Sequence, residues 1–101
     1  MIKVQLIDVQ LIKNNSLIDN NVDDKIIAQS LMSVQDTILE PVIGTSLYNR
    51  LKNDIQLSTM TEDYINLLEN YIWDVLISYT TAKIISSLTY RYANSGMIKS
   101  D

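Results

Sequence analysis

The clearest alternation of apolar and polar positions in this chain runs from Asp23 to Glu40. Apolar residues recur every three or four positions, which places them on one face of a helix, while polar residues cover the opposite side. We expect the helix to start at Asp23 or Asp24, because negative charge is favourable at a helix N-terminus. The predicted core face consists of Ile27, Leu31, Val34 and Ile38, widened by Ala28, Met32 and Leu39.

Gln35 is a polar residue that falls inside this apolar face. A buried amide without hydrogen-bond partners costs about 1–3 kcal/mol, so its side chain must be bonded. We favour bonds to backbone groups of the corner that follows the helix. A contact with another subunit is the alternative.

The corner itself is built around Pro41 and Gly44. Pro41 lacks an amide hydrogen and disfavours a helical residue before it, so the incoming helix is expected to end near Leu39 or Glu40. Gly44 takes a positive φ at little cost, which suits a chain reversal. Two apolar residues between them are expected to plug the corner into the core: Val42 and Ile43.

A short second helix leaves the corner, and Thr45 or Ser46 is expected to cap it with a side-chain oxygen. Its apolar residues are spaced three or four apart and so share one face. That face consists of Leu47, Tyr48, Leu51 and Ile55.

The first seven residues alternate loosely, with Ile2, Val4 and Leu6 on one side, which predicts a short strand or an extended arm. An isolated strand is not stable, so the arm must pack on helices of its own domain or pair with another subunit. Both alternatives stay open. Asp8 is expected to cap a short helix over residues 9–14.

The longest helical pattern runs from Tyr64 to about Ala93, with Thr61 as its cap and Gly96 as its stop. Because apolar residues occupy most sides, we expect a central helix wrapped by the others. A shift of the apolar stripe at residues 78–82 alternatively marks a kink or a break. The main stripe consists of Ile65, Leu68, Ile72, Val75, Leu76 and Tyr79.

The C-terminal end carries Tyr90, Arg91 and Tyr92, followed by a tail with Met97 and Ile98. The basic–aromatic cluster suits a helix C-terminus, where a cation complements the macrodipole. The alternative is a surface that stacks on a base or a peptide. The tail either frays or docks on a partner.

These patterns predict an all-α fold: a small helical bundle with a long central C-terminal helix, a short corner helix after Pro41–Gly44 and an extended N-terminal arm. With 101 residues the chain is expected to form one domain. Within it, residues 1–22 form the arm and short helix, residues 23–94 the helical core, and residues 95–101 the tail.

Cysteine and histidine are both absent, which removes disulfides, thiolate nucleophiles, imidazole ligands and the commonest general base. The acidic pairs at 23–24 and 62–63 are better explained as helix-start charges, and the sequence contains no glycine-rich phosphate loop. We therefore predict no enzyme activity, no cofactor and no metal site.

The net charge of −4 argues against a broad surface for non-specific nucleic-acid binding, which needs a positive field. The most apolar window, residues 71–90, contains Asp74 and Lys83. Charges are costly at the centre of a bilayer, so we predict a buried helix and no membrane span.

Several stretches resemble a recurrent pattern in tailed-phage head–tail connector proteins, and they are most similar to the small connector or ring proteins of Bacteroides and crAss-like phages. The likeness spans nearly the whole chain and departs from the family pattern at Val34, where alanine is expected. The stretches that carry it are Val34-Gln35, Ile38–Gly44 and Leu47–Leu51, supported by Ser16–Ile18, Asn21–Asp23 and Tyr90–Met97.

The resemblance implies a virion structural protein of the neck, made in the host cytoplasm. Such proteins form a homo-oligomeric ring, typically a dodecamer, between the portal protein and the next neck or tail component. They extend the DNA channel and let genomic DNA pass without sequence-specific binding. The candidate subunit or partner contacts are Ile2, Val4, Leu6, Tyr90, Arg91, Tyr92, Met97 and Ile98.

A second hypothesis belongs to another functional class. A small helical regulatory or adaptor protein would bind one host or phage protein through an amphipathic groove.

Overall fold

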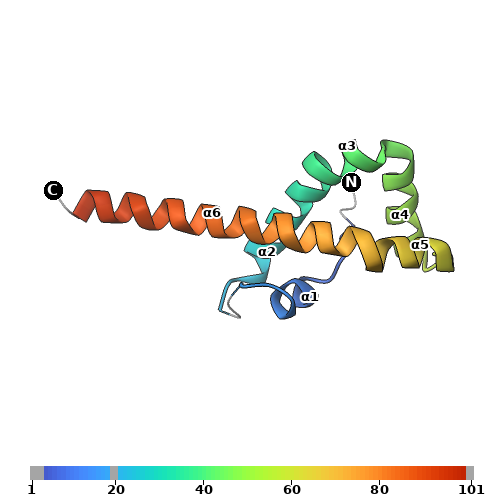
Figure 1. Cartoon of the computed structure of the whole chain (residues 1–101), viewed down its shortest axis with the longest axis horizontal. Helices are drawn as coiled ribbons and strands as arrows, with labels where there is room; N and C mark the ends of the chain where they lie inside the picture. The colour runs from blue at the N-terminus through green and yellow to red at the C-terminus, as the bar shows by residue number, and fades with distance from the viewer. Residues whose placement is uncertain (1–3, 19–20, 100–101) are drawn as a thin grey trace.

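In the computed structural model of this protein, the described backbone comprises residues 4–18 and 21–99, with side chains described up to residue 87. This part of the chain is all-α and contains no strand, as the sequence predicts. Four helical stretches follow one another (Figure 1). The first stretch is α1 (Val9–Asn14), and the third is α4 (Thr45–Leu57). The second is a continuous helical rod that consists of α2 (Asp24–Val34), η1 (Gln35–Leu39) and α3 (Glu40–Ile43). The fourth, also a continuous rod, consists of α5 (Glu62–Leu67), η2 (Leu68–Ile72) and α6 (Trp73–Lys99).

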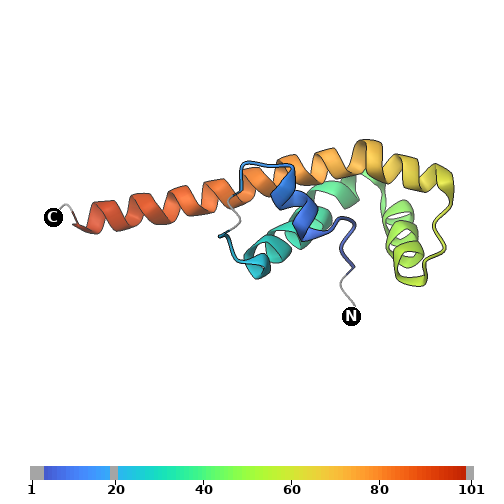
Figure 2. The same cartoon turned by 90° about the horizontal axis from the view of Figure 1, so that it is seen from below.

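The last rod sets the elongated shape of the molecule, which measures 57 × 25 × 23 Å. Helices α1 and α2 lie against its middle and α4 lies near its start, whereas the C-terminal half of α6 extends beyond every other helix (Figures 1 and 2). The predicted long C-terminal helix is confirmed, but the other helices do not cover it on most sides as expected. Tyr71 and Tyr79 show this directly, because 68% and 50% of their surfaces are exposed.

The long helix also ends later than predicted. It runs through Gly96 to Lys99, and its irregularity is the π-helical turn η2 instead of a break at residues 78–82. A glycine inside a helix costs only about 1 kcal/mol relative to alanine, which is too little to force an end. The predicted tail at residues 95–101 is thus helical as far as Lys99.

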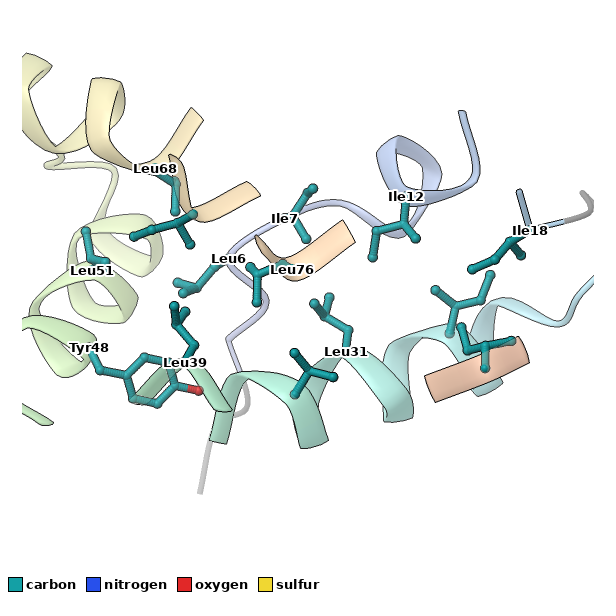
Figure 3. Close-up of a cluster of buried hydrophobic side chains, with 14 residues drawn as sticks. Leu6, Ile7, Ile12, Ile18, Leu31, Leu39, Tyr48, Leu51, Leu68 and Leu76 are labelled. Atoms are coloured by element: carbon teal, nitrogen blue, oxygen red, sulfur yellow. The ribbon is translucent and has the colours of Figure 1, made fainter. Parts of the chain in front are cut away.

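One hydrophobic core lies between the arm, the two rods and α4 (Figure 3). On the last rod its buried positions recur every four residues: Leu68, Ile72, Leu76, Thr80 and Ile84. Such an i±4 row is the ridge that a crossing helix packs against, here α2. Three residues of the predicted stripe lie off this ridge and are exposed: Ile65, Val75 and Tyr79. The other core side chains are Leu6, Ile7, Ile12, Ile18, Ile27, Leu31, Val34, Leu39, Tyr48 and Leu51.

The corner differs from the prediction in how the helix passes Pro41. The helix continues to Ile43, because η1 widens the preceding turn and the Glu40 amide donates to the Gln35 carbonyl five residues back. A proline clashes with the carbonyl four residues before it in a regular α-helix, and a π-turn relieves that conflict. The expected end at Leu39 or Glu40 is therefore wrong by three to four residues.

The reversal at Gly44 is confirmed, with φ of 90°. Gly44 is itself the N-cap of α4, so the predicted side-chain cap from Thr45 or Ser46 is wrong. The Thr45 hydroxyl instead donates to the Glu40 carboxylate at 3.0 Å across the corner. Of the two predicted plug residues, Ile43 packs against the core, but Val42 points outward.

The helix starts follow the sequence more closely. Asp8 caps α1 by accepting the Gln10 amide at 2.8 Å, and Asp23 caps α2 by accepting the Lys25 amide at 2.9 Å. Thr61 occupies the N-cap position of α5 without a side-chain hydrogen bond. Three of the predicted starts are thus confirmed in position. The predicted side-chain cap forms at Asp8 but not at Thr61, and the cap by Asp23 was not predicted.

Candidate functional site

Gln35 is fully buried and uses its amide to hold the N-terminal arm. Its Oε1 accepts the Leu6 amide at 2.8 Å, and its Nε2 donates to the Val4 carbonyl at 3.0 Å. The side-chain amide therefore pairs with the extended backbone much as a neighbouring strand would. The prediction that Gln35 satisfies backbone groups is right in kind, but those groups belong to the arm and not to the corner.

Tyr48 extends this polar contact towards solvent. Its hydroxyl lies 3.3 Å from Gln35 Nε2 and donates to Asp36 Oδ1 at 2.7 Å. Burial, helped by the hydrogen bond to Asp36, raises the pKa of the Tyr48 phenol well above its ordinary value. The phenol therefore stays protonated and remains a donor. The Lys52 ammonium lies over the Tyr48 ring, 4.4 Å from its centroid.

Trp73 completes the anchor from the second rod. Its indole Nε1 donates to the Leu6 carbonyl at 2.8 Å, so both backbone groups of Leu6 are bonded by side chains from different helices. We call Gln35, Tyr48 and Trp73 the arm clasp. Because Leu6 and Ile7 are both buried in the core of their own chain, the arm from Val4 to Ile7 lies on its own domain.

This placement decides among the predicted subunit contacts near the N-terminus. Leu6 is enclosed by its own core, so its prediction as a subunit contact is wrong, because the clasp and the core leave it no free surface. Val4 is half-buried, and Ile2 lies outside the described residues.

The C-terminal candidates all lie on α6. The backbone of Tyr90, Arg91, Tyr92, Met97 and Ile98 is helical, and their side chains lie outside those that the structure describes. Their predicted contacts with a subunit or partner stay a prediction.

An apolar groove runs between the α2–α3 rod and the start of the last rod. Its most exposed members are Val42, Tyr71 and Tyr79, which sequence reasoning had assigned to the corner plug or to the wrapped helix. The tyrosine hydroxyls supply its polar side-chain atoms. The groove is lined by Ile38, Leu39, Val42, Ile43, Leu67, Tyr71, Ile72, Val75 and Tyr79.

A second buried polar group, Asp54, closes the other end of α4. Its carboxylate accepts Arg50 Nε at 3.1 Å and the Thr59 hydroxyl at 3.0 Å, while its carbonyl accepts the Thr59 amide at 2.9 Å. These bonds fix the loop over residues 58–61, where Ser58 is left-handed with φ of 56°. We did not predict this network from the sequence, although the i,i+4 spacing of Arg50 and Asp54 was a signal for it.

Within residues 4–18 and 21–99, no group of three or more acidic side chains is placed to hold a metal ion. In the same part of the chain, no helix has the length and apolar character needed to cross a membrane.

Together, the described residues define a small all-α domain with an exposed apolar groove. Residues 39–100 match a family model described as a family of unknown function (DUF6712), and since the match covers more than half of the chain, the protein belongs to this family. The matched range contains the groove except for Ile38, whereas the arm and Gln35 precede it. No curated protein and no solved structure matches the chain.

Proposed function

We propose that this protein is a virion structural protein, a head–tail connector subunit that assembles into a ring between the portal and the tail. The proposal combines the resemblance of the corner region to phage connector proteins with the exposed groove. The groove carries it on the structural side, because contiguous exposed apolar surface on a small domain marks an assembly or docking site.

The exposed apolar side chains make this observation specific. Val42 keeps 78% of its surface exposed and Tyr71 keeps 68%, although both lie beside buried neighbours in the groove. Burial of apolar surface contributes about 25 cal/mol per Å², so covering these side chains with another protein stabilises the assembly. The arm clasp and the Asp54 network fix the helices that carry the groove, which presents it as a pre-formed surface.

In the proposed ring, the subunits extend the portal channel and dock the next neck or tail component. An acidic protein suits a channel wall that must pass DNA without holding it, because tight binding requires many lysine or arginine contacts with phosphate. If exposed acids such as Glu62 and Glu69 face that channel, replacing them with lysine should slow DNA ejection. Unchanged DNA retention and ejection would count against this part of the proposal.

The copy number of the protein in purified virus particles tests the connector role. Quantitative mass spectrometry against the portal protein should give a ratio near one copy per portal subunit. Absence from clean particles would refute a virion role, because a connector ring stays in the mature neck.

The groove also favours a second candidate, a regulatory adaptor that binds one helix of a host or phage protein. Gene neighbours separate the two candidates cheaply. Portal and capsid genes beside this one support the connector, whereas a soluble one-to-one complex with a non-virion protein supports the adaptor.

A further inference from the structure

None of the described residues of its own chain fills the groove, and the neighbouring sequence positions are acidic. Glu40 directly follows one lining residue, Leu39, and Asp74 directly precedes another, Val75. None of the lining residues or their immediate chain neighbours is basic. An occupant is therefore expected to combine apolar side chains with positive charge at the rim.

Among the described residues, no other helix lies beside the C-terminal end of α6 (Figures 1 and 2). Ile84 is the last buried side chain described on α6, and Ile85, Ser86 and Ser87 are exposed. Beyond them the backbone continues as a helix to Lys99, clear of every other helix in both views (Figures 1 and 2). A helix of this length is marginal in water on its own, so packing against another surface would stabilise it.

The charges of the chain are divided between these two parts. Residues 4–82 contain eleven acidic and four basic side chains, whereas residues 83–99 contain three basic ones and no acidic one. The basic residues are Lys83, Arg91 and Lys99. The extended end of α6 and the acidic domain therefore carry opposite charge, which favours contact between two copies through these different parts.

We infer that residues 83–99 of one copy dock in the apolar groove of a second copy. The contact is head-to-tail: each chain offers its α6 end to one neighbour and its groove to another. Such heterologous contacts close into a ring when the rotation between copies allows it. The inference rests on the proposed function, which it deepens by naming the two surfaces that would join neighbouring subunits.

Site-directed photo-crosslinking of the full-length protein tests which segment enters the groove. A benzoylphenylalanine at position 42 is tolerated by the fold because Val42 is largely exposed. In a mixture of unlabelled and ¹⁵N-labelled chains, the cross-linked peptides should join position 42 of one copy to residues 83–99 of the other. Cross-links that join groove to groove, or groove to other segments, would overturn the inference.

Association measured by sedimentation velocity tests the energetics with matched variants. Val42→Glu places a charge in the groove and should weaken association about tenfold or more. The control Leu57→Glu places the same charge at an apolar residue outside the groove that is 61% exposed, and it should weaken association less. Arg91→Glu should weaken association more than Lys25→Glu, which makes the same charge reversal on the exposed surface of α2.

These measurements test the head-to-tail contact separately from the connector role. Equal effects of groove and control variants, or a wild-type chain that stays monomeric at every concentration, refute the head-to-tail docking. Neither result changes the copy number expected in virus particles, which tests the connector role independently.

Discussion

Replacing Gln35 with leucine removes the hydrogen bonds that hold the arm while keeping an apolar side chain of similar size in the core. The Leu6 amide then loses its acceptor at a buried position, which costs about 1–3 kcal/mol. The Val4 carbonyl is half-buried and recovers water at small cost, and Tyr48 keeps its bond to Asp36. We expect Gln35→Leu to lower the free energy of unfolding by about 2–3 kcal/mol.

Urea denaturation followed by circular dichroism measures this difference, because the helices report the global transition. Gln29→Leu is the matched control: it makes the same substitution six residues earlier on α2, at an exposed side chain, and should change stability by less than about 0.5 kcal/mol. Hydrogen exchange supplies a local readout, in which the Leu6 amide should lose protection in Gln35→Leu before the helices unfold. Equal stability of the two variants, or a Leu6 amide that stays protected, would refute the proposed role of the clasp.

Three further predictions concern the other buried polar groups. Trp73→Phe removes the indole bond to the Leu6 carbonyl and should cost about 1 kcal/mol in urea denaturation, whereas an unchanged midpoint would show that this bond contributes nothing. Because folding raises the pKa of Tyr48 above 10.0, its phenol ionises in the unfolded chain at a lower pH than in the folded protein. The free energy of unfolding should therefore fall as the pH rises above 10. Tyr48→Phe should weaken this fall in denaturation experiments carried out above that pH. A wild-type and variant with the same pH dependence would contradict the assignment. Asp54→Ala removes the carboxylate bonds to Arg50 and Thr59 and should lower the free energy of unfolding by about 1–3 kcal/mol. A protease should then cut the loop over residues 58–61 faster than in the wild type. A loop that resists cleavage equally in both would argue against a role for this network.

Local signals made the helix starts predictable from the sequence. Asp8 and Asp23 each precede an apolar periodic segment, and their side chains bond an amide two residues later. The reversal at Gly44 was equally predictable because it requires only a positive φ. In each case a single residue and its near neighbours determine the structure.

The path of the chain around Pro41 was not predictable in the same way. The sequence shows where a helical hydrogen bond is missing, but it does not show that η1 absorbs the defect and lets the helix continue to Ile43. The choice depends on packing of both halves of the rod, which places Leu39 in the core. That outcome also turns Val42 outward and so creates part of the groove.

The partners of Gln35 depend on contacts between distant segments. Its position in the apolar face predicted that it must be bonded, yet its partners lie about thirty residues earlier in the chain. Likewise, the apolar character of α6 predicted burial, but one crossing helix covers only the ridge through Leu76 and Thr80. Tyr71 and Tyr79 remain exposed because no other segment of the described chain covers that side.

If a tailed phage encodes this protein, as the proposed function requires, a cryo-electron microscopy reconstruction of the portal–tail junction in its particles is the most direct test of the connector role. We expect a ring of this fold against the portal, with its copies arranged around the DNA channel. A neck reconstructed at side-chain resolution that contains no copy of this chain would contradict the connector function.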